Sequence, residues 1–166
     1  MMKGPLMIFT LGNYVIDVDV DRTREAYARL PLLSDDCQCR ACRNWVLATD
    51  ALHEGTRIFF TKMGIDLKKV FEAHPQKSNE DRTSLLYEGT ARLYGKILKG
   101  EAALIHETDG EKVDLVFNEA GAYPVASNFK ICFDEYLDIP DGVFRGDDII
   151  EMYFRAEMPQ VIDEKI

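Results

Sequence analysis

The 166-residue sequence lacks any apolar run close to the roughly 20 residues that a membrane-spanning helix requires. Its start, MMKGPLMIFTLGNYVIDVDV, holds a short apolar run but no small-residue cleavage site, so it does not fit a secretion signal. There is also no internal repeat, no low-complexity tract and no long linker rich in proline, glycine and serine. We therefore expect a single domain over residues 1–166, located in the cytoplasm and without a membrane segment.

Basic residues are scarce relative to acidic ones. The chain has 20 lysines and arginines against 29 aspartates and glutamates, which gives a net charge of −9 at pH 7 and a pI of about 4.8. The phosphates of a nucleic acid and the surface of an anionic membrane would both repel this charge, so we expect neither as a partner. The same excess charge is compatible with a basic protein as the partner, although a solvated acidic surface is the more common reason for such an excess.

The familiar catalytic motifs are also missing from the sequence. It contains no G-x-S-x-G elbow, phosphate-binding loop, dinucleotide fingerprint or H-E-x-x-H helix, and only three histidines. No serine stands in a recognisable nucleophile context. These absences favour a non-catalytic binding or accessory protein over an enzyme.

The first 20 residues predict a β-hairpin. Residues Leu6 to Leu11 are mostly apolar, Gly12-Asn13 is a turn signal, and Tyr14 to Val20 alternates between apolar and polar side chains. This alternation indicates a strand with one buried face.

The region from about Asp21 to Gly64 predicts helices. The carboxylate of Asp21 can cap a helix that ends near Leu30. A second helix should start between Cys39 and Ala41, and a third should run from Glu54 to Met63, with Gly64 in the left-handed position just beyond it. In the second helix, one apolar stripe follows the i, i+3, i+4, i+7 rule and contains Cys42, Trp45, Val46 and Thr49.

Short alternating segments fill the second half of the chain and predict strands. We expect strands near residues 68–74, 85–98, 113–118, 129–133 and 150–156. The side chains expected to line the core in the last three are Val113, Leu115, Phe117, Phe129, Ile131, Phe133, Ile150, Met152, Phe154 and Ala156. The predicted fold class is α+β, an antiparallel sheet or sandwich of six to eight strands with two to three helices inserted after the second strand, at about residues 21–64.

The most specific motif is DDCQCRACRNW, which places three of the four cysteines in a C-x-C-x-x-C pattern. Thiolates bind zinc in a tetrahedron, and a C-x-x-C pair at the start of a helix is a common half-site. We therefore assign Cys37, Cys39, Cys42 and Cys132 as candidate metal ligands, with zinc as the expected ion. His53, His74, His106 and Asp36 are the other candidates for the fourth ligand.

Two alternatives to a metal site remain open. A cysteine at a helix N-terminus beside Arg40 and Arg43 would have a lowered thiol pKa, so Cys39 and Cys42 could serve a thiol-redox or metal-dependent enzyme. The motif follows a predicted helix and a polar loop, whereas a thioredoxin-like motif follows a strand. The cysteines could also simply pack as small apolar side chains.

Three segments of the N-terminal half resemble a family of uncharacterised bacterial proteins marked by a C-x-C-x-x-C-R-N motif. They are YVIDVDVDRTREAY (14–27), CQCRACRNW (37–45) and FFTKMGIDLKKVFE (59–72). The resemblance implies a bacterial, cytoplasmic protein. It identifies no catalytic residue.

Overall fold

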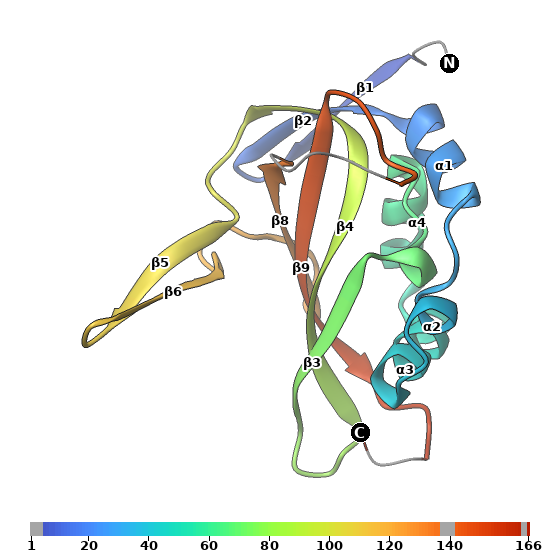
Figure 1. Cartoon of the computed structure of the whole chain (residues 1–166), viewed down its shortest axis with the longest axis vertical. Helices are drawn as coiled ribbons and strands as arrows, with labels where there is room; N and C mark the ends of the chain where they lie inside the picture. The colour runs from blue at the N-terminus through green and yellow to red at the C-terminus, as the bar shows by residue number, and fades with distance from the viewer. Residues whose placement is uncertain (1–4, 137–141, 164–165) are drawn as a thin grey trace.

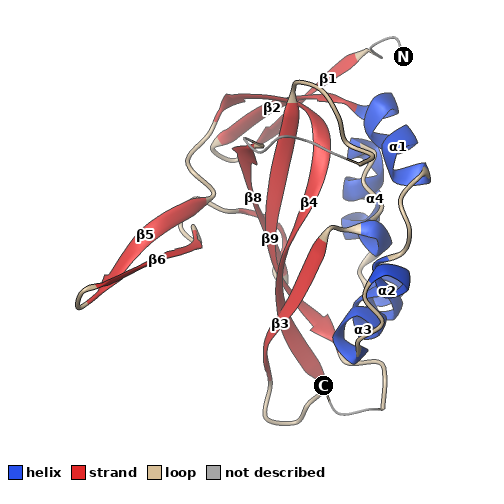
Figure 2. Ribbon diagram, viewed as in Figure 1, coloured by secondary structure: helices blue, strands red, loops and turns tan. Residues whose placement is uncertain are grey.

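The computed structural model describes residues 5–136, 142–163 and 166 and has an α+β architecture (Figures 1 and 2). The helices all lie between the second and third strands, as predicted. They are α1 (Val20–Ala28), the single-turn α2 (Leu33–Asp36), α3 (Arg40–Ala48) and α4 (Glu54–Met63), with 3₁₀ turns at Thr49–Ala51 and Leu67–Lys69. The strands are β1 (Leu6–Leu11), β2 (Tyr14–Asp19), β3 (Glu72–Ser78), β4 (Ser84–Lys99), β5 (Leu104–Asp109), β6 (Lys112–Phe117), β7 (Tyr123–Ala126), β8 (Phe129–Glu135) and β9 (Ile149–Pro159).

Seven of these strands form one antiparallel sheet, which confirms the predicted fold class. The order along the sheet is β1-β2-β4-β9-β8-β7, and β3 pairs with β4 beside this path. One edge of β4 pairs with β3 through residues 85–90 and with β2 through residues 95–99, while the other edge pairs with β9 through residues 84–94. The long strand β4 therefore joins the two halves of the sheet.

The core lies between the sheet and the helices, which cover one side of it (Figure 1). Trp45 of α3 is fully buried. Its ring stacks on that of Phe154 in β9, with 4.9 Å between the ring centroids, and meets the ring of Tyr87 in β4 edge-on, with 5.2 Å between the centroids. Its indole N–H donates to the carbonyl of Leu67 at 2.7 Å. The rows predicted for the last two strands are confirmed as buried, from Phe129 to Phe133 in β8 and from Ile150 to Ala156 in β9.

The cap and turn residues in the sequence predicted the limits of α4 correctly and the start of α1 with a small error. Helix α4 spans the predicted residues, and Gly64 has φ +85 at its C-terminus, where a Cβ would lie 2.6 Å from the carbonyl oxygen of Val20. Asp21 does not cap α1, because the N-cap lies two residues earlier than predicted, at Asp19, which accepts from the Arg22 N–H at 3.1 Å. The earlier start turns Val20 towards the core.

The strand predicted at residues 68–74 begins later than expected. Residues 67–69 form a 3₁₀ turn, and β3 starts at Glu72. The turn is held by the ammonium of Lys68, which donates to the Val46 carbonyl at 3.1 Å and to Asp50 at 2.8 Å. These bonds to α3 and the turn after it favour a compact turn over an extended strand.

One predicted core row is wrong. The side chains of Val113 and Leu115 are each 58% exposed, because β6 pairs only with β5 in a separate two-stranded sheet. This hairpin extends away from the main sheet (Figure 1). Only Phe117, at the root of the hairpin, packs against the core.

In the part of the chain that the structure describes, no helix has both the length and the apolar character needed to cross a membrane.

The contrast between the core and the hairpin can be tested with two matched substitutions. Leu93→Ala removes a fully buried side chain from β4 and should lower the free energy of unfolding by about 2–5 kcal/mol, because it leaves a cavity. Leu115→Ala should change it by less than about 0.5 kcal/mol, because that side chain is largely exposed. Urea unfolding of both variants measures the difference, and a large loss of stability in Leu115→Ala would contradict the exposed placement of β6.

Candidate metal centre

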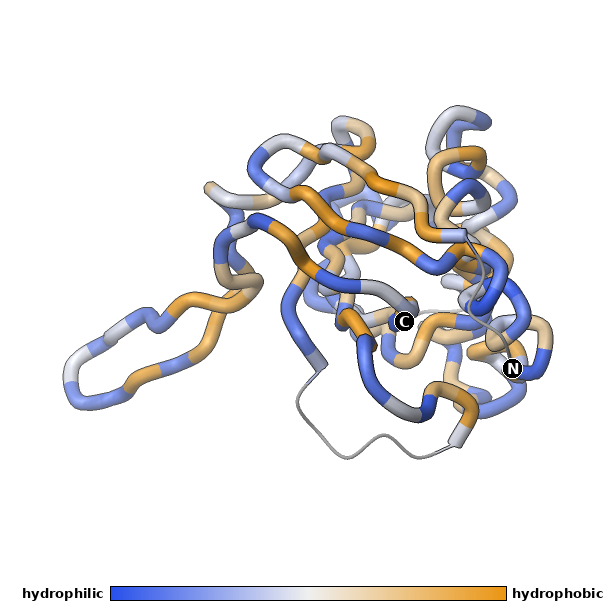
Figure 3. The backbone as a smooth tube through the Cα atoms, turned by 90° about the horizontal axis from the view of Figure 1, so that it is seen from above, coloured by the Kyte–Doolittle hydropathy of each residue, from blue (hydrophilic) through white to orange (hydrophobic). Residues whose placement is uncertain are grey.

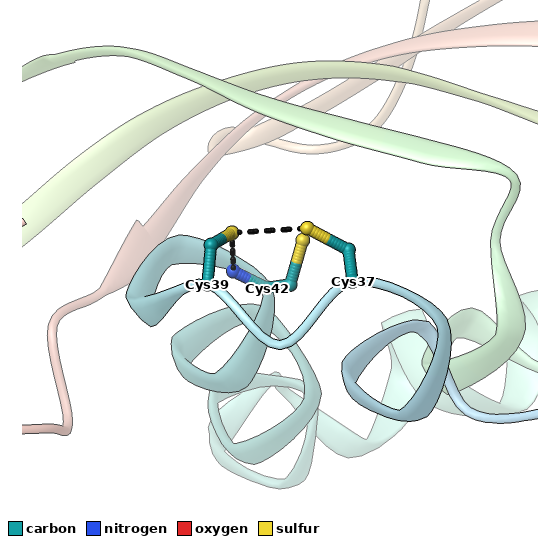
Figure 4. Close-up of side chains that lie close together, drawn as sticks. All are labelled: Cys37, Cys39 and Cys42. Carbon is teal, nitrogen blue, oxygen red and sulfur yellow. Dashed lines mark hydrogen bonds between the residues drawn. The ribbon is translucent and has the colours of Figure 1, made fainter.

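The loop between α2 and α3 brings three thiols together (Figure 4). Cys37 follows α2 in an extended conformation, and Cys39 is the N-cap of α3. The Cys39 sulfur accepts from the backbone N–H of Cys42 at 3.3 Å, in the way that a polar N-cap side chain satisfies the first turn of a helix. The chain therefore turns at Cys39 and places the Cys42 side chain back over the loop.

The three sulfurs lie within 4.8 Å of one another, which is close enough to bind a metal ion. The Sγ atoms of Cys37 and Cys39 are 3.2 Å apart, and none of the three thiols is in a disulfide. Sulfur ligands of tetrahedral zinc, each about 2.3 Å from the ion, lie about 3.8 Å from one another. Small changes in side-chain rotamer would bring Cys37, Cys39 and Cys42 to this spacing.

Cys132, the fourth candidate ligand, does not belong to this group. It lies in β8, is fully buried, and its thiol donates to the carbonyl of Asn118 at 3.4 Å. Burial raises the pKa of this thiol to about 11, which disfavours the thiolate form that binds metals. Cys132 therefore has a packing role in β8, from which it contacts the start of the segment that follows β6.

Among the described residues, none of the other candidates for a fourth ligand joins the group of three sulfurs. His53 caps α4 and accepts from the Gly55 N–H at 3.1 Å through Nδ1. His74 is exposed in β3 near the carboxylate of Glu72, and His106 lies in the hairpin of β5 and β6. Asp36 is adjacent in sequence but is not a member of the group.

The three thiols differ in acidity. Hydrogen bonds from the backbone N–H of Cys39 and from the thiols of Cys42 and Cys39 lower the pKa of Cys37, which is exposed. Burial raises the pKa of Cys42, and its hydrogen bonds to the other two thiols act in the same direction. The exposed end of the cluster is therefore the nucleophilic end in the absence of a metal.

Asn44, within the C-R-N run, is a structural residue that the sequence analysis did not identify. It is fully buried, and its amide donates to the Tyr87 hydroxyl at 3.2 Å and to the Pro159 carbonyl at 3.1 Å. Its oxygen accepts from the backbone N–H groups of Val161 and Ile162, at 2.8 and 3.3 Å. The available signal was an amide on the same helical face as Ala41 and Ala48, because an amide buried there requires several partners.

Tyr87 connects this network to the cysteines. Its hydroxyl donates to the carbonyl of Ala41 at 2.8 Å, in the first turn of α3. Burial is the main reason that its pKa is raised to about 12, and the nearby thiols of Cys42 and Cys39 add to this effect. The start of α3 is therefore held on β4 independently of any metal.

No family model, curated protein or solved structure matches this chain.

The difference in thiol acidity predicts an order of alkylation. In reduced, chelator-treated protein at neutral pH, Cys37 should react with iodoacetamide at least about tenfold faster than Cys42 or Cys132, because it has the largest thiolate fraction and is exposed. Mass spectrometry of peptides sampled over time measures each rate. Equal rates at Cys37 and Cys42 would contradict the hydrogen bonding described above.

Proposed function

We propose that the protein is a small, non-catalytic binding or accessory protein of the bacterial cytoplasm, in which Cys37, Cys39 and Cys42 hold a zinc ion. The observation that carries the proposal is the convergence of three sulfurs within 4.8 Å from a segment of six residues. A reducing compartment keeps such thiols available to a metal. Zinc is the ion that thiolates at a helix start most commonly hold in proteins.

Packing alone is a weaker explanation for this cluster. Cys37 and Cys39 are exposed, so they bury little apolar surface, and only Cys42 is part of the core. A divalent metal ion would offset most of the negative charge of the three thiolates and give the two exposed cysteines a common partner. The N-terminus of α3 would add to this by stabilising negative charge on the sulfurs.

A bound ion would act on the fold through α3. Two ligands, Cys37 and Cys39, come from the loop that precedes the helix, and the third, Cys42, comes from its first turn. The same helix carries Trp45 and Asn44, which attach it to the sheet and to the end of the chain. The ion would therefore fix the loop to a helix that is already anchored, and it would stabilise that loop even with water in its fourth position.

Metal content is the direct test of this proposal. Protein purified without chelator should contain about one zinc per chain, and Cys39→Ser should lose it, because two thiolates alone hold zinc weakly. Cys132→Ala is the matched control and should retain the metal, since Cys132 lies outside the group. Plasma emission spectroscopy measures the metal.

Zinc binding should also stabilise the folded chain. At a free zinc concentration about a thousand times Kd, the gain is about 4 kcal/mol. Thermal unfolding with zinc and with chelator should therefore differ for the wild-type chain and not for Cys39→Ser. A metal-free wild-type protein whose melting temperature ignores added zinc would refute the proposal.

The proposed site has three protein ligands, whereas a closed zinc site has four, so its fourth coordination position would be open. Among the described residues no further cysteine, histidine or carboxylate belongs to the group, and two of the three cysteines are exposed. Water would then complete the tetrahedron. In a closed structural site, four protein ligands exclude such an exchangeable ligand.

Cobalt substitution tests this open position. Adding a small thiol to the Co²⁺-loaded protein should change its visible absorption, because the thiol replaces water at the metal. The same addition should leave a Cys₄ zinc-ribbon protein, used as a control, unchanged. An unchanged spectrum in both proteins would mean that a fourth protein ligand closes the site.

A thiol-redox role is the second candidate, and the 3.2 Å separation between the sulfurs of Cys37 and Cys39 supports it. The sequence suggested Cys39 and Cys42 for this role, but burial raises the pKa of Cys42, so Cys37 and Cys39 are the better pair. The Cys37 thiolate would attack a disulfide substrate and release one thiolate from it, and the Cys39 thiolate would then displace the second thiol and close a disulfide. The substrate disulfide would be reduced and the protein oxidised. Counting free thiols after treatment with glutathione disulfide separates the candidates: loss of two thiols favours the redox role, and protection of all three by zinc favours the metal role.

A further inference from the structure

The hairpin of β5 and β6, here called the arm (residues 104–117), contributes nothing to the main sheet. Its two strands pair only with each other, and it projects from the body of the molecule (Figure 1). Hydrophobic residues occur along both of its strands (Figure 3). An isolated two-stranded hairpin is at best marginally stable in water, so the arm is an unusual feature for a chain that acts alone.

The root of the arm is fixed to the body. The backbone N–H of Asn118 donates to the carbonyl of Ala103 at 2.9 Å, and its side-chain amide donates to the carbonyl of Ala102 at 2.9 Å. The Asn118 side-chain oxygen accepts from the Gly121 N–H, and its carbonyl accepts from the thiol of Cys132. These bonds at the root present the arm in a defined direction.

The strand register divides the arm into two different faces. Because Leu104 lies opposite Phe117 and Thr108 opposite Val113, alternate pairs share a face. The apolar face carries Leu104, His106, Thr108, Val113, Leu115 and Phe117. The acidic face carries Ile105, Glu107, Asp109, Lys112, Asp114 and Val116.

The acidic face is not neutralised by the chain itself. Glu107 lies directly opposite Asp114, and like charges at such positions destabilise a sheet. Lys112 is 3.7 Å from Asp114, but Glu107 and Asp109 make no ion pair within the described residues. This arrangement provides sites for positive charges from a partner.

The apolar face and the strand edges are also uncovered. Val113 and Leu115, both on the apolar face, are each 58% exposed. Each strand of the arm has one neighbour only, so the outer backbone groups of both strands pair with no other strand of the described chain. Such an edge is a template for an added strand.

We propose that the arm binds an extended segment of a basic partner protein, in which lysine or arginine alternates with apolar residues. The segment would add to the arm as a third strand. At the outer edge of β6, its alternate side chains would lie on opposite faces, the apolar ones beside Val113 and Leu115 and the basic ones beside Asp114, with Glu107 one strand further on the same face. The inference rests on the proposed binding role and is independent of the zinc site.

A second copy of the chain fits the arm less well. Pairing two arms edge to edge would place the acidic face of one arm beside acidic side chains of the other, or beside an apolar face. Each arm carries four carboxylates and one lysine, so the first arrangement is repulsive. A basic strand removes this repulsion.

The test measures binding of a capped twelve-residue peptide of alternating lysine and valine to the full chain by fluorescence anisotropy. A peptide of alternating glutamate and valine has the same pattern with the opposite charge. A third peptide, with the lysines and valines grouped in separate halves, keeps the composition and removes the alternation. The alternating lysine peptide should bind, and both controls should bind at least about tenfold more weakly.

Variants locate the bound peptide. Glu107→Lys and Leu115→Ser should each weaken binding about tenfold or more, through the acidic and the apolar face respectively. Glu80→Lys and Ile58→Ser make the same changes at exposed positions of the body and should leave the affinity unchanged. All four side chains are exposed or largely exposed, so circular dichroism should show folded variants.

Three results would overturn the inference: equal binding of the three peptides, an affinity that the arm variants leave unchanged, or a dimer by sedimentation that dissociates in Leu115→Ser. The second result would leave a binding role for another surface. All three would leave the zinc measurement intact, since the proposed metal ligands lie in the loop before α3 and in its first turn, away from the arm.

Discussion

The packing of Trp45 between α3 and the sheet is the interaction on which the rest of the structure depends. The ring is fully buried against Tyr87 and Phe154, which belong to the two central strands β4 and β9. Its N–H binds the Leu67 carbonyl and so ties α3 to the turn before β3. Aromatic burial on this scale fixes both the distance and the rotation of a helix. The rotation places Cys42 inward and leaves Cys37 and Cys39 at the surface.

The hydrogen bonds of Asn44 fix the rotation of α3 within this packing. Apolar contacts tolerate small rotations, whereas a buried amide with four partners does not, because each lost hydrogen bond leaves a polar group unsatisfied. Those partners include the Tyr87 hydroxyl and the backbone of residues 159–162. The C-R-N run thus combines a thiol at the helix start with an amide that locks the same helix. A metal ion added there would meet ligands that are largely preorganised, which lowers the entropic cost of binding.

Features governed by neighbouring residues could be predicted from the sequence. The hairpin of β1 and β2, the limits of α4 and the left-handed Gly64 follow from turn and cap signals within a few positions. The grouping of Cys37, Cys39 and Cys42 follows from their spacing at a helix start. The position of Cys132 and the partners of Asn44 depend on which strands become neighbours, and no local pattern contains that information. The alternation of apolar and polar residues in β6 predicts that the two faces of this strand differ. It does not tell whether another part of the protein covers the apolar face.

Because the sequence pattern does not tell what covers a face, the wrong prediction that Val113 and Leu115 are buried is informative. A row of apolar side chains normally marks a buried face, because leaving apolar surface in contact with water costs free energy. The chain exposes this row on a hairpin whose root is held by Asn118 and whose other face gathers unpaired carboxylates. Two unfavourable features on one projecting element are difficult to explain by folding alone, because neither stabilises the isolated chain. Both would become favourable if a single basic, apolar strand lay along the arm, so one partner of the proposed kind would account for both.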